Sequence, residues 1–213
     1  MTKESELSTL SHMRRTAQDR LLSLAKQRPI LRAADAARLG VHTQAFTRLV
    51  AEGVLERVGR GRYRSPNAAA TEHHGLALAA ASVPRGVVCL LSALVFHGLG
   101  TQNPSEVWMA IDRRARMPRV AWPPLHVVRF SGRALTEGVE THRIEGEAVR
   151  VYSVAKTIAD CFKYRNKLGM DVALEALKDA WRRRRVRMTD LDRHARVCRV
   201  ERAMRPYLEA LTA

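Results

Sequence analysis

Two helical patterns joined by a glycine turn constrain the fold of residues 30–65 more than any other part of the chain. We predict a short alanine-rich helix over about residues 32–38. Gly40 then allows the positive φ that a tight turn needs, because it has no side chain. A second helix is predicted over about residues 42–52, with Thr43 as a candidate N-cap. This spacing predicts a helix-turn-helix.

A basic hairpin is predicted directly after the second helix. The runs 54–58 and 62–64 contain the β-branched residues Val54 and Val58 and the aromatic Tyr63, on either side of the turn Gly59-Arg60-Gly61. Four arginines lie on this hairpin: Arg57, Arg60, Arg62 and Arg64. With a further helix over about residues 15–27, the segment 14–67 is predicted to be a winged helix-turn-helix domain.

The second helix of this segment has a polar face that is suited to a DNA groove. Phe46, Leu49 and Val50 follow an i, i+3, i+4 spacing and are predicted to pack inward. The opposite face carries side chains that hydrogen-bond base edges and phosphates: Thr43, Gln44, Thr47 and Arg48. Winged helices also serve as protein-interaction modules, and charged helix faces are often only solvated. Because the helix face and the hairpin are basic together, duplex DNA binding is the favoured interpretation.

The charge balance also favours a polyanionic partner. The 213-residue chain has a formal net charge of +16. Residues 1–67 contain 13 Lys and Arg against 6 Asp and Glu, and residues 68–213 contain 24 against 15. Both parts are therefore basic, and a hydrophobic content of 46% is sufficient for a packed core.

No targeting segment or metal-site spacing is recognisable. The first 13 residues contain no apolar core of signal-peptide length, and the chain has no run long enough to span a membrane. Cys89, Cys161 and Cys198 are far apart and form no Cys-x-x-Cys pair, which argues against disulfides and a zinc site. We expect a cytoplasmic protein without metal or cofactor.

The rest of the chain predicts a mixed α+β unit that begins after a boundary near Asn67. Short apolar runs predict strands at 87–91, 106–111, 125–130, 140–144 and 149–152. Helices are expected at 71–82, 93–98, 154–164, 171–184, 189–199 and 201–211, with Ser92 and Ser153 as candidate caps. The predicted fold class is therefore α+β, with a helical C-terminal part.

Two short motifs in this second part carry a family resemblance. Ser92-Ala93-Leu94-Val95-Phe96-His97-Gly98-Leu99 comes first, and Val151-Tyr152-Ser153-Val154-Ala155-Lys156-Thr157-Ile158-Ala159-Asp160 follows. In this order behind a winged helix, they resemble the AbiEi antitoxins of type IV toxin–antitoxin systems, which are linked to abortive phage infection. The resemblance covers nearly the whole chain.

The resemblance implies a two-part protein. The winged helix would bind inverted repeats in its own promoter and repress the operon, with two copies bound as a dimer or cooperatively. Residues 70–213 would counteract a nucleotidyltransferase-like toxin, directly or indirectly.

The motif residues also have ordinary structural interpretations. His97 lies on an apolar helix, so we expect a hydrogen-bonded structural histidine, with Gly98 and Gly100 ending that helix. Ser153, Thr157 and Asp160 have the spacing of a helix cap and its first turns, which favours capping and packing.

Catalysis is not expected. No Lys has an Asp or Glu two positions before it, as many metal-dependent nucleases require, and no nucleophile elbow or phosphate-binding loop occurs. A winged-helix regulator with a small-molecule-sensing C-terminal domain stays open as an alternative, because apolar pockets leave no short motif.

A second basic cluster follows the helix predicted at 171–184. It consists of Arg182, Arg183, Arg184, Arg185 and Arg187. Arginines favour a helix C-terminus through its dipole, but five in six residues exceed what termination requires. Either helix termination or an anion or toxin surface explains them. Four further arginines (Arg113, Arg114, Arg116 and Arg119) are expected to extend this surface.

Overall fold

The computed structural model describes residues 19–25, 30–59, 61–66, 71–120 and 122–212. The chain folds into two compact units. The N-terminal unit comprises Met1–His74 together with Arg143–Glu147, and the second unit comprises Gly75–His142 and Ala148–Ala213. The predicted boundary near Asn67, both ends of the first predicted helix and Arg60 lie outside the described residues.

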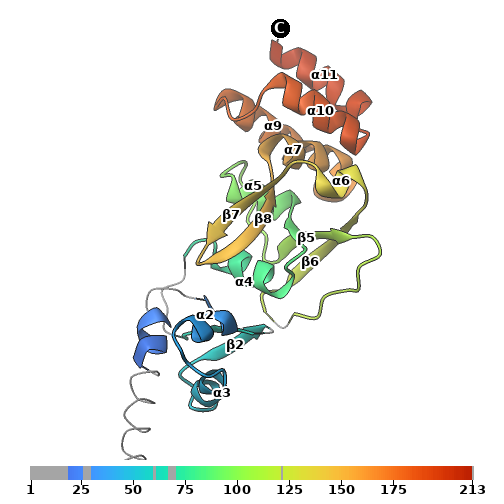
Figure 1. Cartoon of the computed structure of the whole chain (residues 1–213). Helices are drawn as coiled ribbons and strands as arrows, with labels where there is room; N and C mark the ends of the chain where they lie inside the picture. The colour runs from blue at the N-terminus through green and yellow to red at the C-terminus, as the bar shows by residue number, and fades with distance from the viewer. Residues whose placement is uncertain (1–18, 26–29, 60, 67–70, 121, 213) are drawn as a thin grey trace, which may run out of the picture. The chain divides into compact units, whose positions relative to one another are not determined.

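The N-terminal unit alternates helices with short strands (Figure 1). A helix over residues 19–25 precedes five elements: β1 (Ile30–Arg32), α2 (Ala33–Arg38), α3 (Gln44–Ala51), β2 (Glu56–Gly59) and β3 (Arg62–Arg64). The strands form an antiparallel sheet of order β1-β3-β2. β1 was not predicted, because its only pairing partner is the distant strand β3, in the register Ile30↔Arg64.

The core of this unit is built from the apolar stripe of α3. Phe46 and Leu49 are 0% and 1% exposed and pack with Leu21, Leu31 and Leu55. The Phe46 ring also stacks on the Tyr63 ring of β3, with centroids 4.2 Å apart and planes at 12°. The helix pattern predicted from the sequence is therefore confirmed in its inward face.

The turn between α2 and α3 follows the sequence prediction, but the predicted cap does not. Gly40 has a φ of +68°, which confirms its role as the left-handed turn residue. Thr43 is the residue before α3, yet its backbone is already helical and its side chain makes no capping hydrogen bond. The expected Thr43 cap is therefore wrong.

The second unit is a five-stranded mixed sheet with helices, which confirms the predicted α+β class. Its strands are β4 (Val87–Val88), β5 (Val107–Asp112), β6 (Leu125–Phe130), β7 (Val139–Ile144) and β8 (Glu147–Tyr152). The strand order is β6-β5-β4-β8-β7, with β4 antiparallel to β5 and parallel to β8. β5 and β6 are parallel, so a long connection is needed between the end of β5 and the start of β6. β6 lies at one edge of the sheet.

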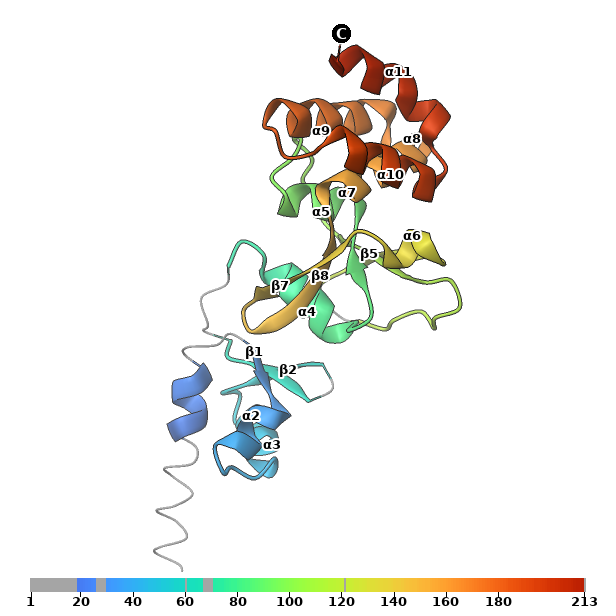
Figure 2. The ribbon, with the colours of Figure 1, turned by 45° about the horizontal axis from the view of Figure 1, so that its top comes forward.

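Helices of this unit begin and end near the predicted positions. They are α4 (His74–Ser82), α5 (Leu90–Phe96), α6 (Arg133–Thr136), α7 (Val154–Lys163), α8 (Arg165–Leu168), α9 (Met170–Arg182), α10 (Met188–Cys198) and α11 (Glu201–Thr212). The short helices α6 and α8 were not predicted. Figures 1 and 2 show α7, α9, α10 and α11 gathered together beside the sheet. Among the residues that the structure places, no helix is long and apolar enough to cross a membrane.

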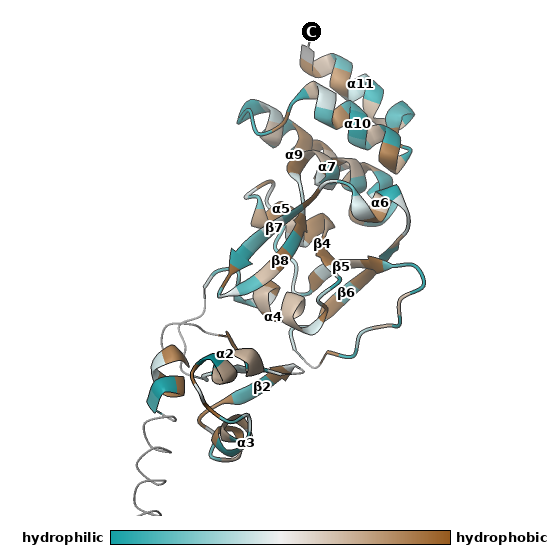
Figure 3. Ribbon diagram, viewed as in Figure 1, coloured by the Kyte–Doolittle hydropathy of each residue, from teal (hydrophilic) through white to brown (hydrophobic). Residues whose placement is uncertain are grey.

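Hydrophobic residues are concentrated inside this unit. Figure 3 shows strand β4 in the hydrophobic colours, whereas most of β7 is hydrophilic. Val87, Leu94 and Phe162 are fully buried in one continuous core. The three cysteines are buried and unbridged.

Ser92 is not a helix cap. α5 begins earlier, at Leu90, and Ser92 is buried inside it at 4% exposure. Its hydroxyl accepts a hydrogen bond from the backbone N–H of Trp108 (2.9 Å) and donates to the carbonyl of Glu106 (3.4 Å). Ser92 therefore ties α5 to the start of β5. The predicted strand at 87–91 is correspondingly reduced to two residues.

The second sequence motif caps and packs α7. Ser153 accepts a hydrogen bond from the N–H of Lys156 (3.5 Å), and Thr157 donates to the carbonyl of Tyr152 (3.2 Å). Lys156 and Asp160 form a fully buried ion pair at 2.5 Å. Burial raises the pKa of the Asp160 carboxyl, and the adjacent Lys156 ammonium opposes that shift. Capping and packing are therefore confirmed as roles of this motif.

His97 is a structural histidine, as expected. It is 8% exposed, and its Nε2 lies 2.7 Å from the carbonyl oxygen of Tyr152. Because a carbonyl only accepts, Nε2 carries the proton. Burial lowers the pKa of His97. Gly98, with a φ of +63°, ends α5 where the sequence predicted.

A buried histidine should make the stability of the chain depend on pH. His194 of α10 is 6% exposed, and its Nδ1 has no hydrogen-bond partner among the described residues. Burial, Lys156 of α7 and Arg193 lower its pKa below 6.5, although Glu137 and Asp190 oppose this. Unfolding then takes up a proton below about pH 6.5, so the free energy of unfolding should fall as the pH drops below that value.

Urea unfolding between pH 5 and pH 7.5 measures this dependence. His194→Asn should reduce the loss of stability at low pH, although His97 will keep part of it because its pKa is also lowered. The exposed His42→Asn serves as the matched control and should leave the pH dependence unchanged. An identical pH profile in His194→Asn and the unsubstituted chain would contradict this assignment.

Candidate nucleic-acid interface

The polar face of α3 is exposed to solvent, opposite its buried stripe. Its four residues are Thr43, Gln44, Thr47 and Arg48, and all of them are exposed. The Arg48 guanidinium pairs with Glu52 at 2.9 Å, with 67% of its side chain exposed. Such a surface pair contributes little free energy and can be exchanged for a contact with phosphate or a base. The structure therefore brings these four predicted residues together on one face.

The three hairpin arginines that the structure describes have different partners. Arg57 is exposed and donates to the carbonyl of Gly59, at 3.4 Å. Arg64 pairs with Glu56 at 2.8 Å. Arg62 is half-buried and lies 3.4 Å from a carboxylate oxygen of Glu147. Arg57 is therefore the most accessible of the three hairpin arginines that the structure describes.

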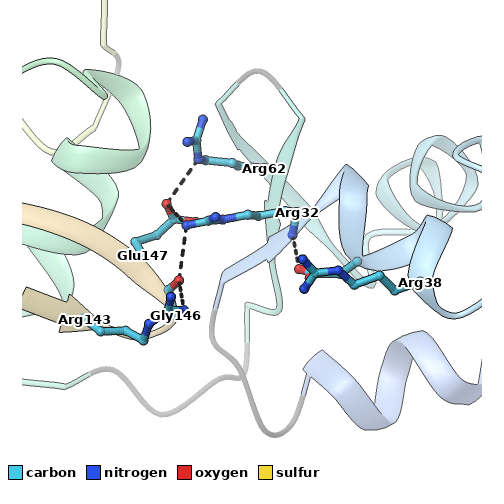
Figure 4. Close-up of polar contacts among 7 residues, drawn as sticks. Arg32, Arg38, Arg62, Arg143, Gly146 and Glu147 are labelled. Atoms are coloured by element: carbon cyan, nitrogen blue, oxygen red, sulfur yellow. Dashed lines mark hydrogen bonds and ion pairs between the residues drawn. The ribbon is translucent and has the colours of Figure 1, made fainter.

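A buried carboxylate holds two arginines of the small sheet. Figure 4 shows the guanidinium groups of Arg32 and Arg62 converging on Glu147. Arg32 donates from Nε and Nη2 to the two oxygens of Glu147, each at 2.9 Å, and Nη2 also reaches the carbonyl of Gly146 (3.2 Å). The Glu147 side chain is 3% exposed. This two-pronged hydrogen bond raises the pKa of Arg32.

A second buried carboxylate lies in the same segment. Glu145 accepts hydrogen bonds from the backbone N–H and hydroxyl of Thr71, at 3.0 and 2.7 Å. His74 Nδ1 lies 2.7 Å from Glu145, and His74 Nε2 lies 3.1 Å from Arg64. Since a guanidinium only donates, Nε2 accepts and Nδ1 donates. Burial alone would raise the pKa of Glu145, but the bonds from Thr71 and His74 lower it.

Residues 143–147 therefore supply the anions for one face of the N-terminal sheet. Sequence reasoning missed this network because Arg32 and Glu147 are 115 positions apart. No local periodicity connects them. Arg62 and Arg64 are therefore bound to carboxylates inside the unit. The polar face of α3 is exposed and can bind a partner.

The arginines at 182–187 divide into two kinds. Arg182 and Arg183 pair with Asp179 at 3.0 and 2.9 Å, and Arg187 lies 3.5 Å from Asp190. Burial would raise the pKa of Asp179, but the hydrogen bond from Arg182 and the other donors around it lower the pKa. Arg182 and Arg183 lie at the C-terminus of α9, as their dipole preference predicts, whereas Arg187 is the residue before α10 and pairs with the first turn of that helix.

Arg184 and Arg185 end α9 through their backbone N–H groups, and their side chains take no part in this termination. The N–H of Arg184 bonds to the carbonyl of Trp181, and that of Arg185 to Ala180. This pattern places Arg184 in the left-handed region, with a φ of +55°. A glycine usually occupies that position, because an L side chain there is unfavourable by about 1–2 kcal/mol. Both side chains are exposed.

The arginines of residues 113–119 are not part of the same surface. Figures 1 and 2 show the connection after β5 on the opposite side of the second unit from the connection between α9 and α10. The expected joint surface is therefore wrong. Among the placed residues, no group of three His, Cys, Asp or Glu side chains could hold a metal ion.

The comparisons with known proteins agree with the sequence resemblance. Residues 19–66 match a family model described as "Transcriptional regulator, AbiEi antitoxin", which confirms the resemblance for the segment that contains α3. No curated protein matches the sequence. The crystal structure of the RV2827C protein from Mycobacterium tuberculosis is similar in fold, with a TM-score of 0.59 and 15% identity. The match covers 84% of this chain and 71% of that chain, and at this identity it shows the fold alone.

Removing the charge of Glu147 should affect both stability and DNA affinity. Glu147→Gln weakens the bonds to Arg32 and leaves two guanidinium groups uncompensated. We expect a loss of about 1–2 kcal/mol in the free energy of unfolding, at the lower end for a buried charged pair because Arg32 is 41% exposed. Affinity for duplexes of any sequence should rise and depend more steeply on salt.

Urea unfolding and fluorescence anisotropy with a mixed-sequence duplex measure the two effects. Glu72→Gln is the matched control, since Glu72 is exposed and also lies in the N-terminal unit. It changes the net charge equally and should leave stability unchanged. If both variants changed stability and affinity alike, the Glu147 network would have no specific role.

Proposed function

We propose that this chain, an AbiEi-type transcriptional regulator in its N-terminal segment, binds duplex DNA through a winged helix-turn-helix and represses its own operon. In this proposal α3 is the recognition helix, and β2 and β3 form the wing. The second unit would act as the antitoxin part against a nucleotidyltransferase-like toxin.

The observation that carries the proposal is the exposed polar face of α3 inside the family-matched segment. Gln44 and Arg48 are one helical turn apart and both exposed. Gln can bond two atoms, N6 and N7, on the major-groove edge of adenine, and Arg can bond O6 and N7 of guanine, so side chains of this kind can read sequence in a major groove. Thr43 and Thr47 would contribute single hydrogen bonds beside them. Arg57 and Arg60 would approach the phosphates, whereas Arg62, which the sequence also suggested for this role, is bound to Glu147.

Removing both long side chains tests the recognition helix. Gln44→Ala combined with Arg48→Ala should weaken binding to the promoter duplex by about 1–3 kcal/mol per lost base contact. Affinity for a scrambled duplex should change little in comparison. Arg57→Ala should instead weaken both duplexes alike and lower the salt slope by about 0.9.

Anisotropy titrations at several salt concentrations separate these two effects. Arg184→Ala is a charge control outside the N-terminal unit. A double variant that keeps the unsubstituted preference for promoter over scrambled DNA, while remaining folded, would refute the role of α3.

The antitoxin role is proposed for residues 70–213, with the 182–187 arginines as its candidate surface. The exposed Arg184 and Arg185 support it, because neither has a carboxylate partner in the part of the chain that the structure describes. Such a surface fits an acidic patch of a toxin or the phosphates of its substrate. Arg182, Arg183 and Arg187 would contribute less, since each already has a carboxylate partner.

Co-expression with a nucleotidyltransferase encoded beside this gene tests the division of labour. Arg184→Glu combined with Arg185→Glu should abolish rescue of growth, and Gln44→Ala with Arg48→Ala should leave rescue intact. Rescue by the charge-reversed chain would remove these arginines from the antitoxin surface, and loss of rescue in the α3 variant would refute the separation of roles.

The small-molecule-sensing alternative receives no support from the described cavities. A cavity of about 380 Å³ between α10 and α11 is lined largely by charged residues, among them Asp192, Arg196 and Arg205. Sensor pockets are predominantly apolar and enclose their ligand. The regulator and antitoxin proposal is therefore preferred.

A further inference from the structure

The connection between β5 and β6 exposes the largest apolar side chains on the described surface. We call the described residues of this connection, 113–120 and 122–124, the arginine loop. Met117 and Trp122 are each 54% exposed, and no other large hydrophobic residue is exposed in the described part of the chain. Tryptophan and arginine are enriched among the residues that dominate binding at interfaces.

The same loop carries cations without anions. Its four arginines are Arg113, Arg114, Arg116 and Arg119, all exposed. None of them pairs with a carboxylate among the residues that the structure places, and the loop itself contains no Asp or Glu. Arg182, Arg183 and Arg187 in the other basic cluster each have a carboxylate partner. The arginine loop therefore has more uncompensated positive charge than the cluster that stands out in the sequence.

The base of the loop is fixed by an arginine of the neighbouring strand. Arg129 of β6 donates from Nη1 to the carbonyls of Asp112, Arg113 and Ala115, at 3.4, 2.8 and 2.9 Å. The N–H of Arg114 bonds to the Asp112 carboxylate at 2.8 Å, and that of Arg113 to the carbonyl of Phe130. Arg113 and Arg114 are consequently held in place before any ligand arrives, which lowers the entropy lost on binding.

A pair of stacked aromatic rings lies near the start of the edge strand. His126 of β6 stacks on Trp108 of β5, with centroids 3.7 Å apart and planes at 20°. The His126 side chain is 46% exposed. β6 is the last strand of the sheet, so its outer edge is paired with no other strand among the described residues.

We propose that the arginine loop and the adjoining edge of β6 form a second nucleic-acid-binding surface, specific for a single-stranded segment. The loop arginines contact successive phosphates, and the Trp122 indole stacks on an unpaired base. Every base offers a flat face to an indole, whereas bases inside a duplex are already stacked on each other. A duplex would therefore use only the arginines. This surface is distinct from α3, which would read duplex DNA.

Single-stranded nucleic acid fits this surface better than an acidic protein does. The apolar contribution is one indole and one thioether among four arginines, without the clustered aliphatic side chains that form the core of a protein interface. A regular polyanion also matches cations that are spread along a loop rather than gathered at one point.

Anisotropy with the full chain and fluorescein-labelled 20-mers tests the proposal. The probes are a single-stranded RNA, a single-stranded DNA and a duplex of the same sequence, which differs from the promoter. Trp122→Ala should weaken binding to one or both single strands about 5- to 100-fold and leave the duplex unchanged. Trp122→Phe, which keeps an aromatic face, should restore most of the affinity. Comparing the affinity for the single-stranded RNA with that for the single-stranded DNA shows whether the 2′-hydroxyl contributes to binding.

Charge and location are separated by a matched pair of variants. Arg114→Ala with Arg116→Ala should lower the salt slope for single strands by about 1.4, at about 0.7 per phosphate contact. Arg202→Ala with Arg205→Ala, at two exposed positions of α11, removes the same charge elsewhere in the second unit and should leave that slope unchanged. Gln44→Ala with Arg48→Ala should also leave it unchanged, so failure of the α3 proposal would not be mistaken for failure of this one.

Three results would overturn the proposal. The first is single-strand affinity that Trp122→Ala leaves intact. The second is an equal loss of slope in both double-arginine variants, which would indicate attraction by net charge alone. The third is displacement of the labelled strand by poly-L-glutamate as efficiently as by unlabelled RNA or DNA, which would assign the surface to an acidic protein. Thermal melting of each variant excludes loss of the fold as the cause.

Discussion

The stacking of Phe46 on Tyr63 fixes the geometry on which the candidate DNA interface depends. Phe46 lies on the inward face of α3, and Tyr63 is the central residue of β3. The stack therefore joins the exposed polar helix to the hairpin that follows it, and the exposed face of α3 keeps a defined direction relative to that hairpin. A recognition helix needs such rigid support, because base contacts require positions accurate to within about 0.5 Å.

Compensation of charge, rather than the number of arginines, distinguishes the surfaces of this chain. Glu147 binds Arg32 and Arg62 inside the N-terminal unit, Glu56 pairs with Arg64, and Glu145 bonds to His74. Asp179 binds two arginines at the end of α9. The surfaces left for a polyanion include the face of α3, Arg57, Arg184 with Arg185, and the arginine loop.

Local patterns in the sequence predicted what depends on neighbours along the chain. The buried stripe of α3, the turn at Gly40, the cap at Ser153 and the buried role of His97 all follow from spacing and residue type. Contacts between distant residues were not predictable in this way. Strand β1 exists only through pairing with β3, Ser92 bonds to β5, and the partner of Arg32 is 115 positions away. The i, i+4 spacing of Lys156 and Asp160 was present in the sequence. Only the structure shows that the pair is buried, and burial makes the loss of either partner costly in stability.

Backbone and side-chain NMR shifts on addition of a duplex from the chain's own promoter region test the central claim most directly. The account predicts the largest changes at Thr43, Gln44, Thr47 and Arg48, with smaller ones at Arg57, and few at buried Phe46. A scrambled duplex should shift the hairpin signals more than those of α3, since phosphate contacts do not depend on sequence. Promoter-specific changes confined to the second unit, with the α3 signals unmoved, would contradict the assignment of α3 as the recognition helix.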